Sequence, residues 1–358
     1  MSDFDYGNAR LRARKGSLLD RPAYTELSSL DAEGMLAHLA AAAYRPEVEH
    51  ATARETGAAA LRDAIRSHLA RQLEQLRSFY SGRARVLVDV LLSRWDLHNL
   101  LTLLRGRATD APWEQTIAGV VAVGAFDAAA AEEVARQPDL DRAVDLLATW
   151  RLPNPASARA LVRAHRHYLR TEELPELEHA LVADHFARAT ETLRGAGPEA
   201  RPVRGEIERE VDRRNALMVV RLVHARETTS EDDEARAAPA LLLPGGAIGP
   251  ERVRAALGAS GPGEAAAQVA DAMPEQSLAD ALERWEPEAG VHSLQDELER
   301  RSVAASIALF ARGNPLGAAI PVAFAAAQAA QATNLRLLAE PPGGGEVARR
   351  LIVPEEEQ

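Results

Sequence analysis

One helical pattern occurs three times in this chain of 358 residues, at nearly equal spacing. The pattern is a polar residue followed three positions later by an asparagine, set in an otherwise apolar helical run: Asp96 and Asn99, Asp212 and Asn215, Gln331 and Asn334. The asparagines are 116 and then 119 residues apart. Ordinary solenoid repeats have periods of roughly 20–50 residues, so this longer period predicts three related helical units of domain size.

Each asparagine shares its helical face with apolar side chains, because helical neighbours lie three and four residues away. Asn99 lies on a face with Leu92, Trp95 and Leu103, and the other two asparagines have similar surroundings. An unpaired amide buried there would cost roughly 1–3 kcal/mol. We therefore interpret the three asparagines as helix-to-helix fasteners used three times, and a direct ligand-binding role is the alternative.

The order of predicted elements supports the same three units. Each unit has short helices, then a long helix, then the helix that carries the asparagine. The predicted long helices span residues 58–80, 174–193 and 294–311, and the asparagine helices span 86–105, 205–226 and 320–339. A glycine-containing apolar segment, 121–126, also recurs as 241–248 at an offset of 122. We place the repeats at 1–114, 115–234 and 235–358.

Composition favours an all-α chain, and the three repeats indicate a pseudo-threefold arrangement. Hydrophobic residues make up 46% of the chain but aromatic residues only 4%, and alanine, leucine, arginine and glutamate are strong helix formers. A polar acidic loop is expected at 228–237, a small helix at 346–352 and a solvated acidic tail at 354–358. No stretch has the roughly 20 apolar residues of a membrane span, and the start of the chain does not resemble a signal peptide.

The motif search predicts no enzyme, no cofactor and no metal site. The chain has no cysteine, no phosphate loop, no dinucleotide fingerprint and no nucleophile elbow. Its histidines at 165, 167, 179 and 185 have poor spacing for metal ligation, and we interpret them as solvated surface groups. The net charge of −11 disfavours nucleic acid as a partner.

A basic cluster near the start of the chain is a candidate partner contact. It consists of Arg10, Arg12, Arg14 and Lys15, and an acidic partner or lipid headgroups would suit it. A solvated face with local ion pairs, each contributing under about 1 kcal/mol, is the simpler interpretation of the cluster.

Several short matches together resemble one family. The run Tyr6-Gly-Asn-Ala-Arg10-Leu-Arg-Ala13 with Leu18-Leu19 is similar to the opening of the C subunit of the archaeal and bacterial V/A-type ATPases, a relative of the eukaryotic V-ATPase d subunit. Asp96-x-x-Asn99, Asp212-x-x-Asn215, Leu243-Pro-Gly-Gly246 and Asn334-Leu-Arg336 extend the resemblance over nearly the whole chain. One departure is clear: the family has acids before the third asparagine, where this chain has Gln328, Ala329 and Gln331.

The resemblance implies an all-α funnel of three similar units. It implies a monomeric, non-catalytic connector in a peripheral membrane complex, on the cytoplasmic face of the cell membrane. Such a connector seats the central shaft, formed by the D and F subunits, on the membrane rotor ring and transmits torque for proton or sodium transport. A free-standing helical adaptor for soluble partners is the competing hypothesis.

Overall fold

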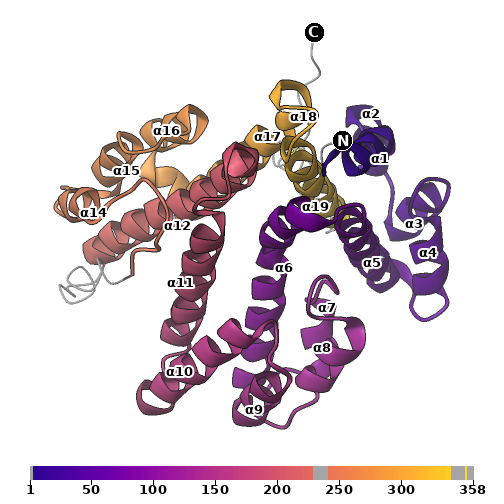
Figure 1. Cartoon of the computed structure of the whole chain (residues 1–358), viewed down its shortest axis with the longest axis horizontal. Helices are drawn as coiled ribbons and strands as arrows, with labels where there is room; N and C mark the ends of the chain where they lie inside the picture. Colours follow the sequence, from indigo (N-terminus) through magenta and orange to yellow (C-terminus); the bar gives the residue numbers. More distant parts are fainter. Residues whose placement is uncertain (1–2, 229–240, 340–350, 353–358) are drawn as a thin grey trace. The chain divides into compact units, whose positions relative to one another are not determined.

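The computed structural model describes residues 3–228, 241–339 and 351–352, and every regular element in these ranges is a helix (Figure 1). This confirms the predicted all-α class. The predicted loop at 228–237, the helix at 346–352 and the tail at 354–358 lie largely or wholly outside the described residues, although Leu351 and Ile352 are described and are not helical. The chain divides into two compact bodies, Met1–Asp184 with Ile307–Gln358 and His185–Ser306.

The first body contains the N-terminal helices and the last two helices that the structure describes. The N-terminal helices are α1 Asp5–Lys15, α2 Arg21–Leu27, α3 Ala32–Ala40, α4 Arg45–Thr52, α5 Gly57–Ser78, α6 Gly82–Ala108, α7 Trp113–Ala118, α8 Ala128–Ala135, α9 Leu140–Trp150 and α10 Pro155–Thr171. The last two are α18 Leu309–Arg312 and α19 Ala319–Ala339, and α11 Leu174–Leu193 contributes residues to both bodies.

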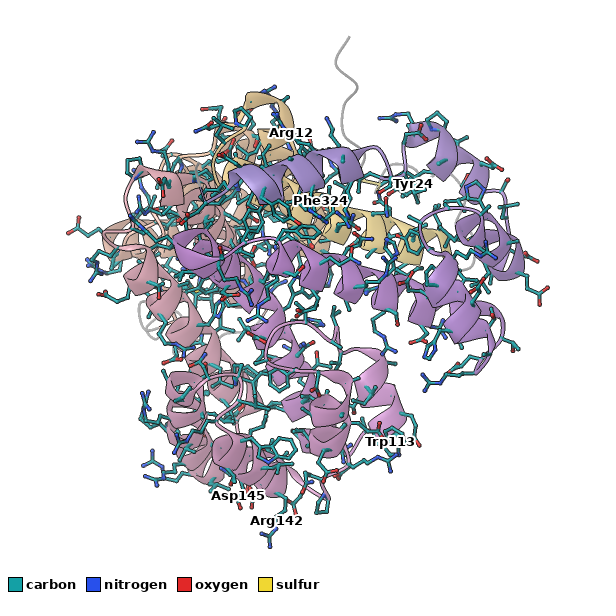
Figure 2. The ribbon with its side chains drawn as sticks, turned by 45° about the vertical axis from the view of Figure 1, so that its right-hand side comes forward. Arg12, Tyr24, Trp113, Arg142, Asp145 and Phe324 are labelled. Atoms are coloured by element: carbon teal, nitrogen blue, oxygen red, sulfur yellow. The ribbon has the colours of Figure 1, made fainter. Side chains whose placement is uncertain are left out.

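The core of the first body forms around α5 and α19. The apolar side chains of α5 recur every three or four residues, and Leu61, Ile65 and Leu73 are fully buried. Helix α19 is buried on nearly all sides, which its run of small alanines permits because they let neighbouring helices approach closely. It packs on α5, α1 and α18, so the first and last described helices of the chain meet in one core. Phe324 of α19 lies inside this body, and Arg12 of α1 lies at its surface (Figure 2).

The second body is built on the long helix α12, Arg201–Thr228. Its core combines apolar residues of α12 with those of α14 Pro250–Leu257, α15 Pro262–Ala270 and α16 Gln276–Glu283. The remaining elements are the 3₁₀ turns η1 Pro198–Ala200 and η3 Pro287–Ala289, and α17 Gly290–Ile307. The predicted single helix over 294–311 is wrong in one respect, since a turn at Ala308 separates α17 from α18.

Candidate functional site: the asparagine latches

Asn99 of α6 holds the extended segment that follows α7. Its Nδ2 donates to the Val121 carbonyl oxygen at 2.6 Å, and its Oδ1 accepts from the Val121 backbone N–H at 2.9 Å. The side-chain amide thereby pairs with both backbone groups of one residue, as a neighbouring strand would. Asn99 is fully buried, so these two bonds satisfy an amide that water cannot reach. We call this arrangement an asparagine latch.

Two carboxylates extend the first latch. Asp96 Oδ1 accepts from the Ala125 N–H at 2.8 Å, and Glu74 of α5 accepts from the Gly124 N–H at 2.7 Å. Burial raises the pKa of Asp96 to about 6, against the lowering effect of the Ala125 N–H. Gly124 has φ +78°, and an added Cβ would lie 2.5 Å from Asp96 Oδ1, so this position requires glycine.

The second latch, in the second body, repeats this geometry. Asn215 of α12 donates to the Leu243 carbonyl at 3.1 Å and accepts from the Leu243 N–H at 2.9 Å. Asp212 accepts from Ala247 N–H at 2.7 Å and Ile248 N–H at 3.1 Å, and burial raises its pKa. A Cβ on Gly246 would lie 2.3 Å from Asp212 Oδ1.

The partners of the first two latches match at one offset. Val121, Gly124 and Ala125 correspond to Leu243, Gly246 and Ala247, each 122 residues later. The offset of 122 predicted for the segments 121–126 and 241–248 is therefore confirmed by their hydrogen bonds.

The third latch holds the described residues near the end of the chain. Asn334 of α19 donates to the Ile352 carbonyl at 2.8 Å and accepts from the Ile352 N–H at 2.9 Å. Its side chain also bonds Tyr24, whose pKa burial raises to about 12. All three amides are therefore paired, as predicted. For Asn99 and Asn215 the predicted helix-to-helix fastening is wrong, because their partners are non-helical backbone. Asn334 also holds non-helical backbone, but its bond to Tyr24 of α2 does join two helices.

Gln331 makes the third site different from the first two. Its Oε1 accepts from the Leu19 N–H at 2.7 Å, and its Nε2 donates to the Tyr44 hydroxyl at 2.7 Å. These partners precede Gln331 by about 300 residues, so the contact ties α19 to the start of the chain. A neutral amide supplies both the acceptor and the donor that are used here.

A buried charged cluster lies behind Tyr44. The Tyr44 ring stacks on His68 at 3.6 Å between centroids, and Glu47 pairs with both His68 and Arg71. Burial lowers the pKa of His68 to about 4, which keeps its imidazole neutral near pH 7. Burial opposes ionisation of Glu47, but the bonds from Arg71 and His68 prevail and lower its pKa. The charged and polar side chains of the cluster pair with one another, so we interpret the cluster as a support for packing.

Asn8 pins α1 to the loop before α19, a contact that sequence reasoning missed. Its Nδ2 donates to the carbonyls of Pro315 and Gly317 at 2.9 and 3.0 Å, and its Oδ1 accepts from the Tyr80 hydroxyl at 2.7 Å. Gly7 allows this approach, since a Cβ there would lie 2.3 Å from the Tyr80 ring. The sequence signal was the Gly-Asn pair inside the N-terminal motif.

The basic cluster of α1 lies largely on aromatic rings. The guanidinium of Arg10 lies 4.6 Å from the Tyr6 ring centroid, and that of Arg14 lies 4.7 Å from the Phe79 ring centroid. Lys15 lies 5.2 Å from the Phe310 ring centroid, whereas Arg12 is exposed. Cation–π contacts of this kind are worth about 0.5–1 kcal/mol at exposed sites. Three of the four cations of the cluster therefore already contact rings of their own body, and the role of the cluster as a partner contact stays a prediction.

The structure corrects the interpretation of two histidines. His165 is buried at 8% exposure and contacts Asp141 at 2.9 Å, and His185 is buried at 7% exposure. Both lie on the inward sides of amphipathic helices, which the sequence interpretation overlooked. His167 is exposed, as predicted, and pairs with Glu176. Within the described ranges no three acidic or histidine side chains gather in a way that could hold a metal ion.

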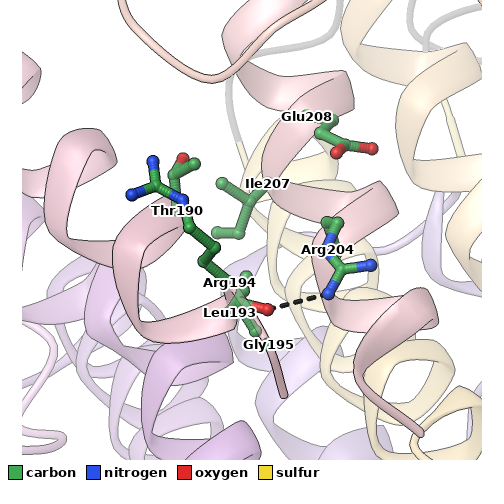
Figure 3. Close-up of a pocket in the computed structure, with 7 residues that line it drawn as sticks. All are labelled: Thr190, Leu193, Arg194, Gly195, Arg204, Ile207 and Glu208. Atoms are coloured by element: carbon green, nitrogen blue, oxygen red, sulfur yellow. Dashed lines mark hydrogen bonds between the residues drawn. The ribbon is translucent and has the colours of Figure 1, made fainter. Parts of the chain in front are cut away.

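A hollow of about 270 Å³ in the second body lies between α11 and α12 (Figure 3). Its lining includes Thr190, Ile207 and Glu208. Arg204, which also lines it, donates to the Leu193 carbonyl at the end of α11 at 2.7 Å and so caps that helix.

Over its described residues the chain is an all-helical protein whose buried polar side chains hold backbone segments in place. Residues 7–341 match the ATP synthase (C/AC39) subunit family. The chain therefore belongs to this family of ATP synthase subunits, which is non-catalytic. Among the described helices, none combines the length and apolar character that crossing a membrane requires.

Individual relatives agree with the family. The chain is 29% identical to the V-type ATP synthase C subunit of Thermus thermophilus over 221 residues, which cover 62% of this chain and 63% of that protein. It is 28% identical over 217 residues to the V-type ATP synthase C subunit of Deinococcus radiodurans, covering 60% and 59%. The A-type ATP synthase C subunit of Methanosarcina barkeri is 26% identical over 146 residues, 41% of each chain. The matched region thus spans less than two thirds of these relatives.

Proposed function

We propose that this chain is the central-stalk connector of a V/A-type rotary ATPase or ATP synthase. In this role it seats the shaft, formed by the D and F subunits, on the membrane rotor ring and transmits torque for proton or sodium transport. The family match over residues 7–341 carries the proposal. The chain acts as one monomer per complex at the cytoplasmic face of the membrane.

The latches support a role under mechanical load. With repeats at 1–114, 115–234 and 235–358, Asn99 of the first repeat holds Val121 of the second. Asn215 of the second repeat likewise holds Leu243 of the third. Each of these two latches therefore joins one repeat to the next through paired buried hydrogen bonds. A connector that carries torque needs junctions of this stiffness.

Gln331 supports a closed arrangement of the three repeats. It joins α19 of the third repeat to Leu19 and Tyr44 of the first, and Asn8 adds contacts to Pro315 and Gly317. A chain whose last repeat returns to its first suits the pseudo-threefold funnel that we propose. Such a funnel could join a broad ring to a narrow shaft.

A free-standing helical adaptor is the competing function, and co-purification separates the two. The tagged chain is isolated from membranes in mild detergent, and the proteins that accompany it are identified by mass spectrometry. We expect the rotor-ring protein together with the D and F subunits. In a strain without the ring, the shaft proteins should still accompany the chain. Recovery of soluble proteins alone, without any of these partners, would reject the connector in favour of the adaptor.

A further inference from the structure

Helix α10 carries an arginine stripe that contains no acid. Arg159, Arg163, Arg166 and Arg170 recur at intervals of four, three and four residues, and all four are exposed. These intervals place them on a single helical face about 16 Å long. The 17 residues of α10 include no aspartate or glutamate, in a chain whose net charge is −11.

The stripe is poorly neutralised by its own body. Arg159 and Arg166 have no ion-pair or hydrogen-bond partner within the described part of the chain. Arg163 reaches Asp184 only at 3.9 Å, with 68% of its side chain exposed, and Arg170 contacts the His167 ring. Like charges at this spacing repel one another, so the stripe costs stability unless an anion covers it.

Some exposed arginines elsewhere in the molecule are neutralised within the chain. They pair with an acid three or four residues away on the same helix: Arg45 with Glu49, Arg136 with Glu132, Arg194 with Glu191, and Arg284 with Asp280. Those of α1 at 10 and 14 lie over aromatic rings instead. On the neighbouring helix α9, the exposed surface mixes both signs, with Arg142 beside Asp145 (Figure 2).

Two exposed apolar side chains lie close to the stripe in the sequence. Leu169, next to Arg170, is 56% exposed, and Trp150, just before the turn into α10, is 42% exposed. Within the first body, α9 and α10 lie together at the end remote from α1 (Figure 1). Arginine with tryptophan and leucine at the edge of an amphipathic helix is the composition of surfaces that rest on lipid headgroups.

We propose that the arginine stripe of α10, together with the exposed side chains of Trp150 and Leu169, binds the anionic headgroups of a phospholipid surface. Lipid suits the stripe better than an acidic protein segment does. The arginines form a row without intervening acids, and such acids would be needed to fix the register of a bound protein segment. The site is separate from the stalk role: the chain could join the stalk without touching lipid, and could bind lipid without joining the stalk.

Sedimentation of the purified full chain with lipid vesicles tests the proposal. We expect binding to vesicles of phosphatidylcholine with phosphatidylglycerol and none to phosphatidylcholine alone. Each arginine near an anionic surface contributes about fivefold to binding. The variant R159Q/R163Q/R166Q/R170Q should therefore bind at least about 100-fold more weakly, and the milder R159Q/R166Q about 25-fold more weakly. Replacing all four by lysine should keep binding within about fivefold.

A matched control removes the same charge elsewhere. The variant R45Q/R136Q/R194Q/R284Q alters exposed arginines that have acidic neighbours, and it should bind vesicles within about threefold of the wild type. Circular dichroism establishes whether each variant is folded. If the four-residue variant is not folded, the two-residue variant R159Q/R166Q is used for the comparison. Equal losses in the stripe and control variants would overturn the proposal. The proposal would also be overturned if the wild-type chain did not bind anionic vesicles and the stripe variant no longer bound the protein complex. That result would identify an acidic protein as the partner of the stripe.

Discussion

The first two latches and the third share an asparagine but differ in what stands three residues before it. Asp96 and Asp212 accept hydrogen bonds from backbone N–H groups in the segment that leads to the following helices. Gln331 instead bonds Leu19 and Tyr44, near the start of the chain. The polar residue of each of the first two sites therefore bonds backbone that follows it in the chain, whereas the polar residue of the third bonds residues near the start of the chain.

The comparison shows that the residue three positions before each asparagine matches the hydrogen-bond donors and acceptors that it faces. A carboxylate suits a turn that presents only N–H donors, even though burial raises the pKa of Asp96 to about 6. At Gln331 one partner donates and the other accepts, and Glu47 lies close enough to Tyr44 to affect its pKa. A neutral amide avoids placing another negative charge there. The departure from the family's acids is thus compatible with a site that is fully hydrogen-bonded.

Loss of a latch asparagine should have the largest effect. Asn215→Leu removes two hydrogen bonds and leaves the buried N–H and carbonyl of Leu243 unpaired, so we expect a loss of about 2–5 kcal/mol in the free energy of unfolding. Denaturant titration measures it. Arg201→Leu, at an exposed position of the same helix, is the control and should change stability by less than about 0.5 kcal/mol. A loss below about 1 kcal/mol for Asn215→Leu would show that the latch contributes little to the stability of the fold.

The glycines beside the two aspartates should come next. Gly124→Ala and Gly246→Ala each place a Cβ within 2.5 Å of a carboxylate oxygen, and Gly124 also has a positive φ. We expect each to lower the melting temperature, with a cost of about 1–4 kcal/mol. Gly205→Ala in α12 meets no atom within 4 Å and should instead be neutral or stabilise by under about 1 kcal/mol. Similar effects at all three glycines would contradict the tight contact with the aspartates.

Asp96 should make stability depend on pH. Its pKa in the folded chain is about 6, above its ordinary value of 3.8, so its protonated form favours folding. This contribution is full below about pH 4 and is lost as the pH rises through about 6. Relative to Asp96→Asn, the wild type should lose about 1–3 kcal/mol between about pH 4 and pH 7. Parallel stability curves for the two proteins would mean that Asp96 ionises without cost.

Gln331→Glu should have the smallest effect and restores an acid of the family type. Gln331 is only 3% exposed, so burial should raise the pKa of a carboxyl group at this position. Bonds from Leu19 N–H and the Tyr44 hydroxyl would offset part of the cost. We expect near wild-type stability at about pH 4 and a loss of about 0.5–2 kcal/mol at about pH 7 in denaturant titrations. A variant that gains stability as the pH rises would refute the preference for a neutral amide.

The sequence predicted the helices and the latch asparagines, but not most of their partners. Leu61 and Ile65 follow the helical period, and Asn99 stands out because it interrupts an apolar stripe. Val121 was missed as its partner because an extended residue carries no periodic signal, although its segment was seen to recur. The contacts of Gln331 with Leu19 and Tyr44 join positions about 300 residues apart, and only the packing of α19 on the N-terminal helices brings them together.

The connector role is tested most directly by ion pumping in membranes that lack this chain. We expect ATP hydrolysis by the headpiece to continue while ATP-driven pumping is abolished, because the shaft is no longer joined to the ring. Adding back the wild-type chain should restore pumping, and Asn215→Leu should restore it less well at an undiminished rate of hydrolysis. If membranes without the chain pumped ions at the normal ratio to ATP hydrolysed, the chain would not be the connector.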